Sequence, residues 1–70
     1  MEMKKLSSGS LRAAGYDARS RVLRVEMTNG STLEHSGVSE EAARRLLSSA
    51  SAWSYYRDNI EEEFPATRIR

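Results

Sequence analysis

The chain of 70 residues contains no cysteine, and its one histidine is at position 35. These absences exclude a disulfide framework, a cysteine-based zinc site and the usual histidine-rich metal sites. We therefore expect no metal and no cofactor. A chain of this size buries only about 60% of its unfolded surface and is marginally stable. The core must hold the domain together unaided or with a partner chain, which predicts a monomer or a weak homodimer.

Long apolar runs are also lacking. The N-terminal segment MEMKKLSS has no apolar stretch of the kind found in signal peptides. No other segment approaches the roughly 20 apolar residues that a membrane helix requires. The sequence therefore predicts a soluble, cytoplasmic protein without membrane contact.

Catalytic arrangements are equally scarce. The four glycines are isolated, so no glycine-rich loop can cradle a phosphate, and no serine lies in a glycine-flanked elbow. The consecutive glutamates 61 to 63 would point in different directions on a helix and cannot converge on one cation. We expect His35 to be a half-buried packing residue. The sequence thus predicts no catalytic residue, no metal ligand and no enzymatic activity.

What the sequence does contain is a clear hairpin. Residues 22 to 27 alternate apolar and polar side chains, as strands with one buried face do, and Asn29-Gly30 is a strong turn signal. A two-residue turn would move the apolar side chains of the next strand to the polar face. A three-residue loop instead pairs Val25 with Leu33 and keeps the apolar faces together. The register therefore predicts the longer loop, with Gly30 left-handed.

Large apolar side chains near the C-terminus follow the spacing of a helix. Pro65 would end this helix, and Ser39 and Ser51 are the expected N-caps of an earlier helix beginning near Glu40 and of this one. A helix over 52 to 64 places on one face Trp53, Tyr56, Ile60 and Phe64.

The order of the elements predicts the fold class. A further strand is expected over 11 to 16, followed by a turn in which Asp17 accepts hydrogen bonds from the next backbone amides. Strands followed by helices predict an α+β fold. We expect a three-stranded antiparallel meander followed by two helices packed on one sheet face.

The domain boundaries follow from the same pattern. The whole chain, 1–70, is expected to be one domain with an ordered core of about 8–65. Both ends lack apolar periodicity, so residues 1–7 and 66–70 are expected to be flexible.

The net charge of +1 conceals an uneven distribution. Residues 1–24 hold six basic and two acidic side chains, whereas residues 25–70 hold five basic and eight acidic ones. Either the two parts attract each other in the fold, or the basic part is a binding face. On the second interpretation, arginines contact phosphates and a tyrosine stacks on a base, and the predicted nucleic-acid-binding residues are Arg12, Tyr16, Arg19, Arg21 and Arg24.

Taken together, these segments resemble the KTSC domain, a small bacterial and phage domain named for its occurrence at the C-terminus of some lysyl-tRNA synthetases. The resemblance covers roughly residues 8 to 65 and implies a compact stand-alone domain with a role in RNA metabolism. The chain departs from the family pattern at Leu33 and His35 (usually aromatic), Ser39 (often proline) and Trp53 (usually glycine). The matching positions are Leu11, Gly15-Tyr16-Asp17, Leu23-Arg24-Val25-Glu26-Met27, Gly30, Val38, Leu46-Leu47, Ser51, Tyr55-Tyr56, Ile60 and Phe64-Pro65.

Two hypotheses about function remain open. The first is a non-enzymatic binding module that contacts RNA or an RNA-associated protein through the basic sheet and turn surface. The alternative is a protein–protein interaction adaptor of bacterial or phage origin that makes no nucleic-acid contact. Its expected interaction surface would include Asp17, Trp53 and Tyr55. The sequence does not name a ligand.

Overall fold

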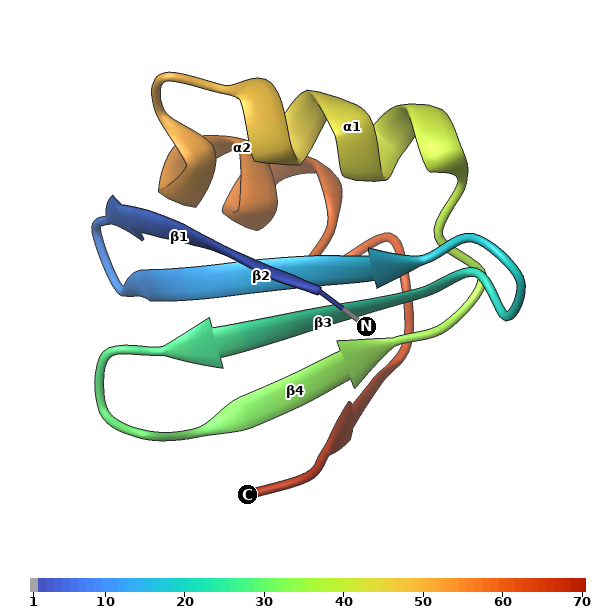
Figure 1. Cartoon of the computed structure of the whole chain (residues 1–70), viewed down its shortest axis with the longest axis horizontal. Helices are drawn as coiled ribbons and strands as arrows, with labels where there is room; N and C mark the ends of the chain where they lie inside the picture. Colours follow the sequence, from blue (N-terminus) through green and yellow to red (C-terminus); the bar gives the residue numbers. More distant parts are fainter. Residues whose placement is uncertain (1) are drawn as a thin grey trace.

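A computed structural model describes residues 2–70 as an antiparallel sheet with two helices over one face (Figure 1). The strands are paired in chain order, so each strand is antiparallel to the next. The expected α+β class is therefore confirmed. No helix among these residues is long and apolar enough to span a membrane. The elements in order are β1 (Met3–Ser8), β2 (Leu11–Asp17), β3 (Val22–Met27), β4 (Thr32–His35), α1 (Glu40–Ser48), α2 (Ala52–Asn59) and β5 (Ala66–Arg68).

The sheet has five strands, so the expectation of three was wrong. Both additional strands lie where the sequence predicted flexible ends: β1 pairs with β2, and β5 pairs with β4. Each is an edge strand, bonded along one side only, and neither shows the apolar alternation that identifies a half-buried strand. Backbone pairing with β2 and β4 forms these strands, and among their side chains Leu6 of β1 also packs against the core. The expectation for Met1 lies outside the described residues.

The β3–β4 hairpin has the predicted register. Val25 lies opposite Leu33, and Leu23 lies opposite His35. The backbone N–H of Gly30 donates to the carbonyl of Met27 at 3.0 Å, and Gly30 has a φ of +92°. The three-residue loop is therefore confirmed, together with the glycine that it requires.

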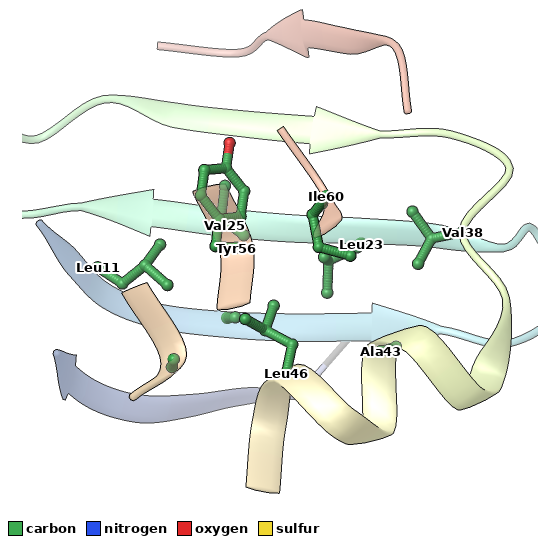
Figure 2. Packing of buried hydrophobic residues seen from close by; sticks show 10 residues of the cluster. Leu11, Leu23, Val25, Val38, Ala43, Leu46, Tyr56 and Ile60 are labelled. Carbon is green, nitrogen blue, oxygen red and sulfur yellow. The ribbon is translucent and has the colours of Figure 1, made fainter. Parts of the chain in front are cut away.

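The core lies between one face of the sheet and the two helices, with Ala43 and Leu46 of α1 in the same cluster as the buried residues of α2 (Figure 2). Tyr56 and Ile60 are fully buried, and Trp53 and Phe64 are partly buried against the same cluster, as the predicted stripe requires. However, α2 ends at Asn59 and not at position 64. The chain continues in turns that keep Phe64 against the core without a regular helix.

The two expected N-caps have different outcomes. The Ser39 hydroxyl accepts a hydrogen bond from the backbone N–H of Ala42 at 3.2 Å, which confirms it as the cap of α1. Ser51 precedes α2 but makes no capping bond with its side chain. The prediction for Ser51 was therefore right about the position and wrong about the interaction.

Candidate functional site

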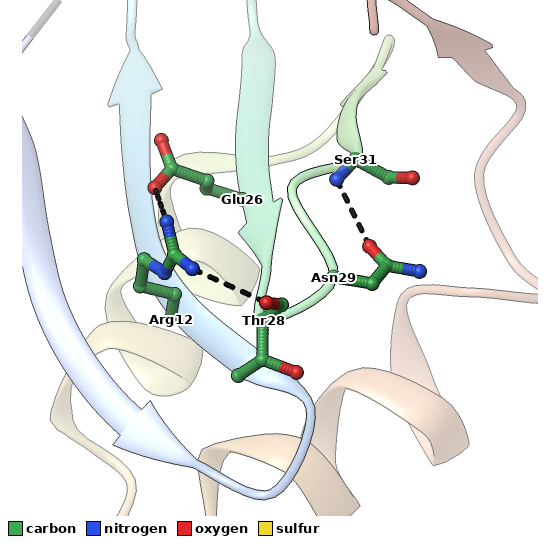
Figure 3. A network of polar contacts seen from close by, with 5 residues as sticks. All are labelled: Arg12, Glu26, Thr28, Asn29 and Ser31. Carbon is green, nitrogen blue, oxygen red and sulfur yellow. Dashed lines mark hydrogen bonds and ion pairs between the residues drawn. The ribbon is translucent and has the colours of Figure 1, made fainter.

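The sheet face away from the helices carries Arg12, but this arginine is engaged within the fold. Its guanidinium lies 3.4 Å from the Glu26 carboxylate and donates to the Thr28 carbonyl at 3.2 Å (Figure 3). The β3–β4 loop that contains Thr28 is held by a further bond, in which the Asn29 side chain accepts from the backbone N–H of Ser31 at 2.9 Å. A phosphate at Arg12 would have to compete with these partners.

Arg24 lies on the same open face and is engaged more closely. Its Nε and a terminal nitrogen donate to one oxygen of Glu34 at 2.8 and 2.5 Å. Arg24 and Glu34 are directly opposite each other on β3 and β4, so the sheet register itself produces the pair. The centre of the open face therefore has balanced charge rather than a cationic field.

Tyr16 does not belong to this face. It lies opposite the buried Leu23, on the side of the sheet that the helices cover. Its hydroxyl donates to the carbonyl of Val38, just before α1, at 2.5 Å. The tyrosine is thereby held in one orientation, with its ring beside α1.

The β2–β3 turn places two further predicted arginines at the Tyr16 end of the sheet. Arg19 and Arg21 are exposed, and the carbonyl of Arg21 accepts from the backbone N–H of Val38 at 3.0 Å. The Asp17 carboxylate accepts from the backbone N–H of Arg19 at 3.0 Å, as predicted, and this bond lowers the pKa of Asp17. Because Val38 bonds both Tyr16 and Arg21, the turn and the tyrosine adjoin the start of α1.

A groove of about 470 Å³ opens between β1, the end of β2 and α1. We call it the Tyr16 groove. Most of its lining surface is apolar, while Lys4 and Arg44 place two cations along it and Glu40 one carboxylate. The Lys4 ammonium donates to the Leu47 carbonyl at 2.8 Å. The lining residues are Lys4, Tyr16, Glu40, Ala43, Arg44, Leu47 and Ser48.

The structure therefore divides the five predicted nucleic-acid-binding residues into two groups. Tyr16, Arg19 and Arg21 lie at one end of the sheet beside α1, whereas Arg12 and Arg24 form ion pairs on the open face. The sequence analysis did not select the cations that flank Tyr16, Lys4 and Arg44. The spacing of α1 contained a signal for the second, because Arg44 follows the buried Ala43 and borders the apolar stripe.

The residues of the predicted interaction surface do not form one surface. Asp17 ends β2, while Trp53 lies near the other end of that strand, where its backbone N–H donates to the Ser8 hydroxyl at 3.2 Å. The Trp53 ring is half-buried and stacks on Tyr56, with the centroids 5.8 Å apart. Tyr55 lines a separate hollow between α1 and α2.

The buried polar groups are engaged with each other. His35 is fully buried, as opposed to the half-buried position expected, and its Nε2 lies 2.7 Å from the Tyr56 hydroxyl. Its Nδ1 lies 3.1 Å from the Phe64 carbonyl. Among residues 2–70, no group of three or more histidine, aspartate or glutamate side chains is arranged to hold a metal ion.

These observations define a small α+β domain with a one-sided helical cover and a groove at the sheet edge. The KTSC domain family model matches residues 7–64, so the chain belongs to the KTSC domain family. Among solved structures, a KTSC domain protein from Yersinia pestis is similar at 26% identity, with a TM-score of 0.90 over 99% of this chain and 97% of that one. A comparison with curated proteins gave no match.

Proposed function

We propose that this KTSC domain is a non-enzymatic binding module for single-stranded RNA, which it contacts at the Tyr16 groove and the adjoining β2–β3 turn. The observation that carries the proposal is the placement of cations around an apolar wall. Lys4 and Arg44 flank the groove, and Arg19 and Arg21 extend from the turn that adjoins it. None of these four side chains forms an ion pair within residues 2–70.

The chemistry of the groove matches that of a flexible single strand. Proteins that bind single strands combine a cationic track for the backbone with aromatic side chains against which bases rest. The Tyr16 ring supplies the aromatic wall, and its hydroxyl is already bonded to Val38, so the ring is held in place before a ligand arrives. A duplex keeps its bases stacked, so it would present phosphates, 2′-hydroxyls and base edges to such a groove but no free base face for the tyrosine ring. The RNA association implied by the family resemblance agrees with this proposal.

A titration of a short single-stranded RNA against the isotopically labelled protein tests the proposal. We expect amide shifts in the β2–β3 turn, the start of α1 and β1, with affinity falling as salt rises. Four phosphate contacts on a single strand give a slope of about −3 in log K against log salt. The absence of shifts at low salt would reject the proposal, and shifts confined to the open sheet face would move the site to Arg12 and Arg24.

Neighbouring residues of α1 provide a matched pair of variants. Arg44→Ala removes a groove cation and should reduce the salt slope by about 0.7. Arg45→Ala removes the same charge one position further on. Arg45 does not line the groove, and its guanidinium lies 2.6 Å from the Glu41 carboxylate, so this variant should weaken binding less. Arg24→Ala should also have a small effect, because Arg24 already faces Glu34. Equal losses in all three variants would indicate attraction without a defined site.

A further inference from the structure

The segment that pairs with β4 extends beyond the regular strand β5 at both ends. Regular pairing covers Ala66–Arg68, but hydrogen bonds to β4 and its flanks continue at both ends. The backbone N–H of Ser36 donates to the Pro65 carbonyl at 3.2 Å, and that of Ile69 donates to the Thr32 carbonyl at 2.7 Å. The segment 65–70 therefore follows β4 for its whole length, and in an antiparallel ladder every second residue of such a segment directs its N–H and C=O outward.

The two edges of the sheet are not equivalent. At β1 the pairing with β2 is irregular between Lys5 and Ser8, Ser7 has a positive φ of 50°, and Lys4 is bonded to α1. Bulges and lysines of this kind protect an edge from further pairing. The segment 65–70 has no lysine, and its only proline precedes the strand. The open edge of this sheet is therefore at β5.

A hollow of about 280 Å³ on the open sheet face adjoins this edge. Ile69 borders the hollow and is 50% exposed, the one exposed large apolar side chain among residues 2–70. Met3 of β1 borders the same hollow, so the open face is concave; the other lining residues are Arg24, Glu26, Thr32 and Arg70. A side chain from a segment lying along β5 could enter the hollow beside Ile69.

We propose that β5 accepts an extended acidic peptide as a sixth strand, with apolar side chains alternating with carboxylates. Strand addition takes its affinity from the main chain and its specificity from alternate side chains. Thr67 lies opposite Glu34 on the open face, and Ile69 lies on the same face two residues later. The apolar side chains of the bound peptide would therefore lie on this face, beside Ile69. Carboxylates on the opposite side of the peptide would meet the exposed Arg68, which lies opposite Leu33 and whose guanidinium would exchange its bond to the Arg70 carbonyl, at 2.8 Å, for a carboxylate. Arg70 itself borders the open-face hollow.

Charge selects a peptide partner over a second copy of this chain. The segment 65–70 carries Arg68 and Arg70 and no acidic residue. Pairing two copies through β5 would gather four arginines along one short ladder, and like charges on adjacent strands are destabilising. An acidic strand reverses the sign of this interaction. The inference does not depend on RNA binding, because the Tyr16 groove lies at β1, the opposite edge of the sheet.

The probe for this inference is a capped eight-residue peptide of alternating valine and glutamate, titrated into the labelled protein. We expect shifts at residues 66–69 and new protection of outward amides on β5 from hydrogen exchange. A peptide of alternating valine and lysine should bind about tenfold more weakly or not at all. The same valine–glutamate peptide with N-methyl groups along one edge cannot extend the ladder and should not bind.

Charge reversal gives the matched variants. The Arg68→Glu variant should no longer bind the valine–glutamate peptide and should bind the valine–lysine peptide instead. Arg57→Glu on α2 should leave the preference for the valine–glutamate peptide unchanged. Binding of the N-methylated peptide would overturn strand addition, and an unchanged preference in Arg68→Glu would overturn the charge argument. Concentration-dependent protection of β5 with a doubled mass, and no peptide shift, would assign the edge to a second copy. RNA titration of the same variants reports separately on the Tyr16 groove.

Discussion

At the scale of single residues, His35 and Tyr56 form a buried hydrogen bond whose direction can be assigned from their neighbours. The Phe64 carbonyl can only accept a hydrogen bond, so Nδ1 of His35 carries the proton that points at it. In the neutral ring Nε2 is then the acceptor, and the Tyr56 hydroxyl donates to it. The two rings also meet edge to face, with centroids 5.3 Å apart. The Tyr56 hydroxyl therefore satisfies the acceptor of the buried histidine, and the Phe64 carbonyl satisfies its donor.

Replacement of Tyr56 by phenylalanine tests the importance of this hydroxyl. Tyr56→Phe leaves Nε2 of the buried His35 without a partner, and an unsatisfied buried acceptor costs about 1–3 kcal/mol. We expect the free energy of unfolding, measured in urea, to fall by that amount. Tyr55→Phe is the control. Tyr55 is partly exposed, and its hydroxyl has no hydrogen-bond partner among residues 2–70, so the change leaves no buried group unsatisfied. Equal losses in both variants would contradict the role given to the histidine contact.

The same hydroxyl predicts a pH dependence at alkaline pH. Burial, with a smaller contribution from the Glu61 charge, raises the pKa of Tyr56 from its usual 10.0 to about 12. Between these values the unfolded chain has lost a proton that the folded chain keeps, so stability falls as pH rises through this window. The loss can reach about 2–3 kcal/mol. Urea unfolding from pH 9 to 12 should show a steeper decline in the natural protein than in Tyr56→Phe, and parallel curves would count against this shift.

Gly9 shows how one residue can depend on another far away in the sequence. Gly9 has a φ of +52°, and an added Cβ would lie 2.4 Å from Cδ1 of Trp53. Gly30 also has a positive φ, but nothing lies within 4 Å of the place of its Cβ. Gly30→Ala should therefore cost only the backbone penalty of about 1–2 kcal/mol, and Gly9→Ala clearly more. Thermal or urea unfolding of the two variants makes the comparison, and a smaller loss for Gly9→Ala would show that Trp53 moves aside freely.

At the scale of elements, the two helices begin in different ways. Ser39 caps α1 through its hydroxyl, whereas Ser51 makes no such bond at α2. Ser39→Ala should therefore lower the free energy of unfolding by about 1 kcal/mol. Ser51→Ala should lower it by only a few tenths, since α2 is held by the burial of Tyr56. Circular dichroism during urea unfolding measures both, and a larger loss for Ser51→Ala would reverse this assignment.

How far the sequence predicts an element depends on whether its own side chains are buried. The hairpin of β3 and β4 was predicted in register because a slip of one residue would expose Val25 and Leu33. The edge strands were missed because most of their side chains face solvent and long-range backbone pairing forms them. The predicted binding residues were divided for a related reason. Charge counts place Arg24 in a basic segment, whereas the pairing of Val25 with Leu33, which the sequence did predict, places the Glu34 carboxylate opposite Arg24.

At the scale of the whole molecule, folding neutralises part of the uneven charge along the chain. Two of the three ion pairs join an arginine of the basic first third to a glutamate of the acidic remainder, Arg12 to Glu26 and Arg24 to Glu34. This is the first of the two interpretations that the sequence allowed. Around the Tyr16 groove and the β2–β3 turn, cations are left without such partners among the described residues.

This arrangement predicts that the open-face ion pairs contribute little to stability. The side chains of Arg24 and Glu34 are 41% and 25% exposed, so water and salt screen their attraction. A double-mutant cycle of Arg24→Ala and Glu34→Ala should give a coupling energy of about 0.2–1 kcal/mol, which diminishes in 1 M salt. Glu34→Ala alone releases Arg24 and should bring RNA-induced shifts to the open face. A coupling well above this range, insensitive to salt, would mean that the pair holds the sheet together rather than merely neutralising its surface.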